Sequence, residues 1–71
     1  MKEIFIKEQF IRLDSALKFC GEAQTGGQAK IIIQEGKVSV NGEICTMRGK
    51  KLYKDDKIKY NGCEYIIKNE G

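Results

Sequence analysis

The sequence has no histidine and no long apolar run, and each absence excludes a class of site or segment. The longest apolar run covers only residues 31–33, so no segment is long enough to span a membrane. Without histidine there is no mixed cysteine–histidine metal site and no nucleophile–base pair of the usual kind. We therefore expect that the protein is not an enzyme and that it binds neither a metal nor a cofactor. Side chains distant in the sequence can nevertheless assemble into one site.

Cysteine is also scarce, and Cys20, Cys45 and Cys63 lie too far apart for a CxxC redox or zinc pair. Their odd number, in a chain without a signal peptide, indicates reduced thiols and a cytoplasmic protein. We interpret the three as small buried apolar side chains rather than reactive thiols.

The chain is short, with 71 residues, and its composition is that of an ordinary globular protein: 41% hydrophobic, 32% charged, eight glycines and no proline. A chain of this size buries only about 60% of the surface that its unfolded form exposes, so it has room for one small core and not for a deep active site. We expect a single domain over residues 1–71.

The net charge of +3 comes entirely from the last third of the sequence. Residues 1–47 hold six basic and six acidic side chains, whereas residues 48–71 hold seven basic and four acidic ones. A clustered basic patch is typical of nucleic-acid or anionic-membrane binding, although a lysine run alone more often marks a solvated surface. Six basic side chains gather within residues 48–59: Arg48, Lys50, Lys51, Lys54, Lys57 and Lys59.

Apolar spacing predicts a strand followed by two helices. Residues 3–7 alternate, with Ile4 and Ile6 on one face and Phe5 on the other. Residues 11–20 have helical spacing and end at Gly21, a plausible helix terminator. The second helix is predicted for residues 25–35, ending at Gly36.

The start of the second helix carries two further expectations. Thr25 is the N-cap, and Gln28 is placed to complete a capping box by reaching back to the Thr25 N–H. Ala29, Ile32 and Ile33 form the buried stripe, while Ile31 points away from it and contacts either another element, such as the first strand, or nothing.

Two Asn-Gly pairs predict two β-hairpins, because Asn-Gly suits the positive φ angles of a type I′ turn. The first joins residues 37–40 to 43–46 and leaves Ile44 on the face opposite Val40; the second joins residues 57–60 to 63–67 with one apolar face. The fold class is therefore α+β, with two packed helices and a small, mainly antiparallel sheet.

Several polar and aromatic residues have a structural interpretation. Asn41 is expected to be a turn residue, and Asp55 and Asp56 to be loop and capping residues. Arg12 and Asp14 form at most a local surface ion pair worth about 1 kcal/mol, so Asp14 receives no functional role. The six aromatic residues are assigned mostly to the core or the sheet, and only Tyr53, inside the basic run, is a candidate for base stacking.

Six features follow one another along the chain: RLD at residues 12–14, the hydroxyl of Thr25, Ala29, Ile33, GKVSVNG at residues 36–42 and Asp-x-Ile at residues 56–58. This pattern covers about residues 11–58 and resembles the S-four RNA-binding domain. The segments TGGQAK and RGKKL are similar to small stand-alone bacterial members of the YaaA/YbcJ type. The resemblance implies an αL RNA-binding motif in a ribosome-associated or RNA-associated cytoplasmic protein.

The resemblance also implies which side chains meet RNA. Gly26 departs from the family pattern, because a basic residue often follows the hydroxyl residue, and this puts more weight on backbone amides at the helix start. From the residues alone, Thr25, Gly26 and Gly27 are equally a capped helix start after a turn. The predicted RNA-binding residues are Arg12, Thr25, Gly26, Gly27, Gln28, Lys30, Lys37, Arg48, Lys50 and Lys51.

The function expected from these residues is non-enzymatic binding of structured RNA, with ribosomal RNA as the expected target, through a helix N-terminus and a basic loop. The alternative is a protein-interaction adaptor on the ribosome or on an RNA-processing enzyme, which would use an exposed apolar patch around Ile31 or Tyr53. We expect a monomer with ribosomal or ribosome-associated partners and no membrane partner.

Overall fold

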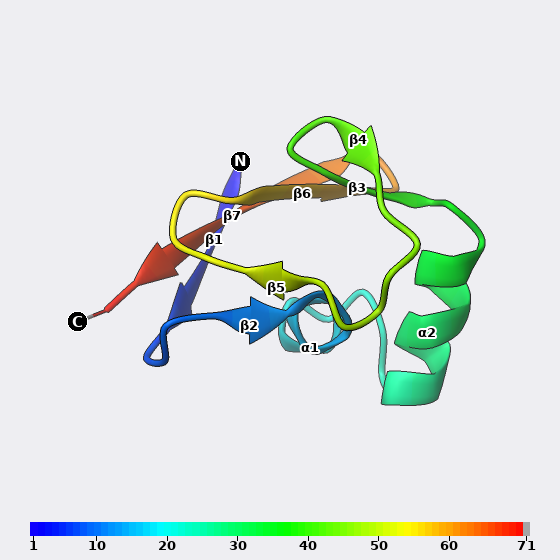
Figure 1. The fold of residues 1–71 in the computed structure, drawn as a ribbon, viewed down its shortest axis with the longest axis horizontal. Helices are drawn as coiled ribbons and strands as arrows, with labels where there is room; N and C mark the ends of the chain where they lie inside the picture. Colours follow the sequence, from blue (N-terminus) through cyan, green and yellow to red (C-terminus); the bar gives the residue numbers. More distant parts are fainter. Residues whose placement is uncertain (71) are drawn as a thin grey trace.

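The computed structural model describes residues 1–70 (Figure 1), and its larger sheet has five strands. β1 runs parallel to β7, and every other neighbouring pair in this sheet is antiparallel, which confirms the mainly antiparallel sheet. The parallel pair joins the two ends of the chain, a contact that no local pattern indicates. The strands lie in the order β1 (Lys2–Ile6), β7 (Cys63–Asn69), β6 (Lys57–Tyr60), β3 (Val38–Val40) and β4 (Glu43–Ile44).

Strand alternation gives this sheet one buried face. Ile4 and Ile6 of β1 are buried and Phe5 between them is exposed, which confirms the predicted alternation of faces. Ile58 on β6 and Ile67 on β7 lie on the same buried side. Both helices, α1 (Leu13–Phe19) and α2 (Gly26–Gln34), lie on one side of the sheet (Figure 1), so the core fills the space between helices and sheet.

α1 is shorter than predicted, because its first two predicted residues are extended. Ile11–Arg12 forms β2, which pairs antiparallel with β5 (Lys51–Leu52) in a second, two-stranded sheet. The N–H groups of Leu13 and Asp14 donate to the carbonyls of Lys50 and Arg48 at 2.9 and 3.1 Å. These hydrogen bonds to a distant segment satisfy the helix start and hold the preceding residues in the ladder. The predicted start at residue 11 is therefore wrong, whereas Gly21 follows the helix with a φ of +85°.

α2 begins at the predicted cap. The Thr25 hydroxyl accepts a hydrogen bond from the Gln28 N–H at 3.0 Å. The other half of the capping box is wrong: the Gln28 side-chain oxygen accepts from the Gln24 N–H at 2.7 Å, not from Thr25. Ile31 is exposed, as its position off the buried stripe predicted.

Both Asn-Gly turns occur at the predicted positions. Asn41 and Gly42 have φ angles of +52° and +88°, and Asn61 and Gly62 have +55° and +79°. Residues with a Cβ other than asparagine and aspartate adopt such angles only at a cost. The registers Val40↔Glu43 and Tyr60↔Cys63 are those of two-residue turns. Both hairpin predictions are confirmed.

Asn41 and Asp56 together connect the first hairpin to the loop before β6. The Asn41 side chain accepts from the Lys57 N–H at 2.9 Å and donates to Asp56 at 3.1 Å, while Asp56 also accepts from the Tyr53 N–H at 2.7 Å. The structural roles predicted for Asn41 and Asp56 are confirmed.

The predicted placement of the aromatic and cysteine side chains is partly wrong. Tyr65 is buried, Tyr60 is half-buried and Phe5 is a strand residue of the sheet, but Phe10, Phe19 and Tyr53 are exposed and lie outside the five-stranded sheet. A core this small is filled by isoleucine, leucine and valine, which leaves these rings at its margin. The three cysteines are free and half-buried rather than buried. No helix within residues 1–70 has the length and apolar character needed to cross a membrane.

Candidate RNA interface

The junction between β2 and α1 holds a carboxylate that contacts two arginines. One oxygen of Asp14 accepts from Arg12 Nη2 and from Arg48 Nε, each at 3.1 Å, and the other accepts from the Ser15 N–H at 2.8 Å. The Asp14 side chain is only 8% exposed, whereas those of Arg12 and Arg48 are 50% and 41% exposed. Asp14 therefore holds two guanidinium groups in place while each keeps a face toward solvent.

This arrangement corrects the interpretation of Asp14. The sequence predicted a surface pair with Arg12 alone and no functional role. In the structure Asp14 is buried, and its second partner comes from a segment 34 residues later in the chain. A contact at that sequence separation has no local signature, which is why the sequence did not indicate it.

The N-terminus of α2 lies against the same arginine cluster. A Cβ built on Gly26 would be 3.7 Å from Arg48 Nη2. Within residues 1–70, the N–H groups of Gly26 and Gly27 have no hydrogen-bond partner. Free N–H groups and the positive end of the helix dipole thus stand beside the Arg48 guanidinium, an arrangement that attracts anions.

The loop of residues 48–50 is fixed to α1 by its backbone, since the carbonyls of Arg48 and Lys50 accept the first N–H groups of the helix. Figure 1 shows the segment between β4 and β5 passing close to the start of α1. Lys50 and Lys51 are exposed, and Lys51 Nζ lies 4.9 Å from the centre of the Phe10 ring.

Not every predicted residue joins this cluster. Gln28 and Lys30 are exposed on the first turns of α2, next to the cap. Lys37 follows the other end of the helix, roughly 13 Å away for nine residues, and pairs with Glu35 at 3.1 Å. We name as the arginine–helix cluster the residues that the structure does bring together: Arg12, Thr25, Gly26, Gly27, Arg48, Lys50 and Lys51.

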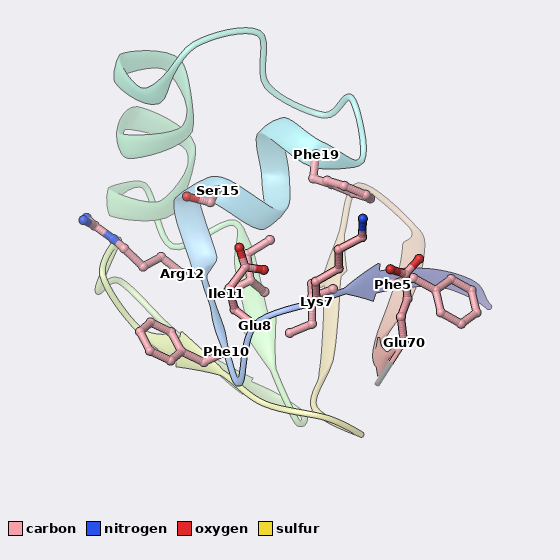
Figure 2. A pocket seen from close by; sticks show the side chains of 10 residues that line it. Phe5, Lys7, Glu8, Phe10, Ile11, Arg12, Ser15, Phe19 and Glu70 are labelled. Atoms are coloured by element: carbon pink, nitrogen blue, oxygen red, sulfur yellow. The ribbon is translucent and has the colours of Figure 1, made fainter.

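A shallow groove of about 710 Å³ borders the cluster on the side of α1 away from α2. Figure 2 shows Phe10 and Arg12 at one end of it and Phe5 and Phe19 at the other. Sequence reasoning missed these exposed rings, although the alternation of Phe10, Ile11 and Arg12 was a signal that Phe10 and Arg12 share a face. Among residues 1–70, no three cysteine or acidic side chains gather closely enough to hold a metal ion.

Comparisons with known proteins agree with this fold. The probable ribosome maturation protein RlbA of Bacillus subtilis (strain 168) is 39% identical over 59 residues, which are 83% of each chain. The solution structure of YbcJ from E. coli, which contains an αL motif involved in RNA binding, matches with a TM-score of 0.72 and 29% identity, over 96% of this chain and 87% of that one. This match confirms the α+β fold with the αL motif.

A third match concerns the fold alone. The crystal structure of the 30S ribosomal protein S4e from Thermoplasma acidophilum has a TM-score of 0.63 at 23% identity, over 84% of this chain and 32% of that one. The family model described as the S4 domain matches residues 4–68, which is nearly the whole chain. The predicted family is therefore confirmed, and the chain belongs to the S4 domain family.

Proposed function

We propose that this chain binds structured RNA, with ribosomal RNA as its target, and that it does so without catalysing a reaction. The observation that carries the proposal is the pair of half-exposed guanidinium groups that Asp14 holds, of which the Arg48 group lies beside the free N–H groups of α2. A guanidinium is planar and donates two parallel hydrogen bonds, which match a phosphate group. A helix N-terminus adds donors and a favourable dipole at the same place.

Two relatives support the choice of RNA. YbcJ carries the αL motif involved in RNA binding, and RlbA is named for ribosome maturation. Contacts mainly to phosphates suit an RNA duplex, because its deep major groove hides the base edges and proteins recognise it by shape, phosphate and 2′-hydroxyl contacts. The RNA would lie across the arginine–helix cluster, with Lys50 and Lys51 contacting further phosphates.

Salt dependence tests this mechanism directly. We take a fluorescently labelled 20-base-pair RNA hairpin and measure its affinity by fluorescence polarisation between 50 and 200 mM KCl. If Arg12, Arg48, Lys50 and Lys51 each contact one phosphate, binding should weaken by about 50- to 150-fold over this range. An affinity that stays constant with salt would contradict phosphate binding.

The triple variant Arg48→Ala, Lys50→Ala, Lys51→Ala locates the site. It should bind more weakly, and its affinity should fall only about 3-fold over the same salt range, because one phosphate contact remains. The matched control is Lys54→Ala, Lys57→Ala, Lys59→Ala, which removes the same charge from exposed residues elsewhere. If the control loses as much affinity as the site variant, the interface lies elsewhere. Crosslinking in cells, followed by sequencing of the bound RNA, identifies the target.

One observation favours the alternative of a protein-interaction adaptor. Phe5 and Phe19 are exposed at the groove of Figure 2, where apolar side chains of a protein partner would fit. An adaptor would stay bound to ribosomal particles after nuclease treatment and at high salt. An RNA-binding protein would be released by both treatments.

A further inference from the structure

The small sheet of β2 and β5 has one face toward the core and one toward solvent. Leu52 is fully buried and Ile11, its partner in the register, is half-buried against the core. Because side chains alternate along a strand, the residues on either side of these two point outward. We call this outward face the β2–β5 platform, and it consists of Phe10, Arg12, Lys51 and Tyr53.

The platform combines two rings with two cations. Phe10 and Tyr53 are 37% and 49% exposed, and their ring centres lie 5.9 Å apart at a tilt of 49°. Arg12 is directly opposite Lys51 in the register, and Lys51 Nζ lies over the Phe10 ring. Figure 2 shows Phe10 and Arg12 projecting to the same side of the chain, with Ile11 directed away from them.

The ion pair with Asp14 accounts for Arg12, but folding alone does not account for Lys51 opposite it or for the two exposed rings. Like charges directly opposite each other across two strands destabilise a sheet. An aromatic ring that stays exposed contributes only part of the stability that its full burial would give. Both features suit a ligand that is anionic and has a flat aromatic face. A nucleotide has both, because its phosphate pairs with cations and its base stacks on aromatic rings.

We propose that the β2–β5 platform binds an unpaired nucleotide of the RNA, with its base stacked on Phe10 and Tyr53 and its phosphate near Arg12 and Lys51. The proposal rests on the proposed function and narrows the ligand to a duplex interrupted by a bulged nucleotide. The base must be unpaired, because neighbouring bases cover both faces of a base inside a duplex. Arg12 belongs to both surfaces, so the unpaired nucleotide would adjoin the duplex bound at the arginine–helix cluster.

The test compares two RNA hairpins that differ by one bulged nucleotide. The bulge carries 2-aminopurine, whose fluorescence is quenched when it stacks on an aromatic ring. The wild-type protein should bind the bulged hairpin about 5- to 150-fold more tightly than the continuous one and should quench the probe. The double variant Phe10→Leu, Tyr53→Leu should lose both effects while keeping the salt dependence of binding, because it loses no phosphate contact.

Two further variants control for folding and for position. Tyr53→Phe keeps the ring and should keep the preference for the bulge. Phe5→Leu, Phe19→Leu changes the two exposed rings at the other end of the groove and should behave as the wild type. Equal wild-type affinity for the two hairpins, a preference that survives in the Phe10 and Tyr53 double variant, or a loss in the Phe5 and Phe19 variant would overturn the platform alone. Wild-type protein that binds neither hairpin would overturn the proposed function as well.

Discussion

The Asp14 side chain accepts three hydrogen bonds, two from arginine side chains and one from the backbone. Its donors are the Arg12 and Arg48 guanidinium groups and the Ser15 N–H. A buried carboxylate is stable only when its charge is balanced and its oxygens are hydrogen-bonded, and all three donors meet that need. The same contacts orient the two arginines of the proposed interface. One residue thus connects the stability of the fold to the geometry of the site.

Asp14→Asn keeps the side-chain shape and removes the charge. The two guanidinium groups then lose their anionic acceptor, and we expect the free energy of unfolding to fall by about 1–3 kcal/mol. The half exposure of both arginines keeps the loss below that of a fully buried ion pair. Urea denaturation followed by circular dichroism measures it.

The same substitution at Asp55 is the matched control for Asp14. Asp55 is exposed, and its Oδ1 lies 3.8 Å from Lys68 Nζ. This surface ion pair contributes at most about 1 kcal/mol to the free energy of unfolding. Asparagine also tolerates the positive φ of +76° at this position. Equal small changes in the two variants would show that the Asp14 contacts contribute no more than a surface pair.

A substitution in the first turn of α2 should change the stability of the fold and the affinity for RNA in opposite directions. Gly26 lies at the start of the helix, where alanine is a better helix former by up to about 1 kcal/mol, and the added Cβ would meet Arg48 only at an ordinary contact distance of 3.7 Å. Gly26→Ala should therefore stabilise the fold. It should also hinder the approach of a phosphate to the free N–H groups.

We expect Gly26→Ala to raise the urea midpoint and to weaken RNA binding by about 2- to 5-fold, the contribution of a helix N-terminus to anion binding. Gln34→Ala places the same residue at the other end of α2 and should leave the affinity unchanged. If RNA binds Gly26→Ala as tightly as the wild type, phosphate does not contact the helix N-terminus. Polarisation with the 20-base-pair hairpin gives both affinities.

The elements predicted correctly are those whose cause is local. The Asn-Gly turns at 41–42 and 61–62, the Thr25 cap and the terminator Gly36 each follow from the conformations that one or two residues prefer. The features that the sequence missed depend on distant partners. β2 replaces the first two residues of the predicted helix because it pairs with β5, about 40 residues later. The strand predicted at residues 3–7 is confirmed as β1, but its pairing with β7 at the other end of the chain was not predicted.

The candidate site follows the same division. The basic residues of the loop and the first turn of α2 were found from composition and from the family resemblance. Their arrangement was not, because the contact of Arg48 with Asp14 and the shared face of Phe10 and Tyr53 both depend on the β2–β5 pairing.

At the scale of the whole molecule, Tyr65 joins the sheet to the loop between α1 and α2. It lies on β7, is buried, and its hydroxyl donates to Glu22 at 2.9 Å. Burial, and next the hydrogen bond to Glu22, raise the pKa of the Tyr65 hydroxyl above its usual value of about 10. The folded protein therefore keeps this proton at a pH where the unfolded chain has lost it.

This difference predicts that stability falls as the pH rises above about 10, because the folded state then binds more protons than the unfolded state. The loss should approach 1.4 kcal/mol per pH unit at most, whereas below pH 10 Tyr65 contributes its full stability. Tyr65→Phe should be less stable at pH 7, since it lacks the bond to Glu22, but its stability should fall less steeply between pH 10 and 11.5. Tyr53→Phe, at an exposed ring, should keep the wild-type profile. Urea midpoints across this range give the three profiles. Parallel profiles for the wild type and Tyr65→Phe would show that ionisation of Tyr65 does not cause the loss of stability at high pH.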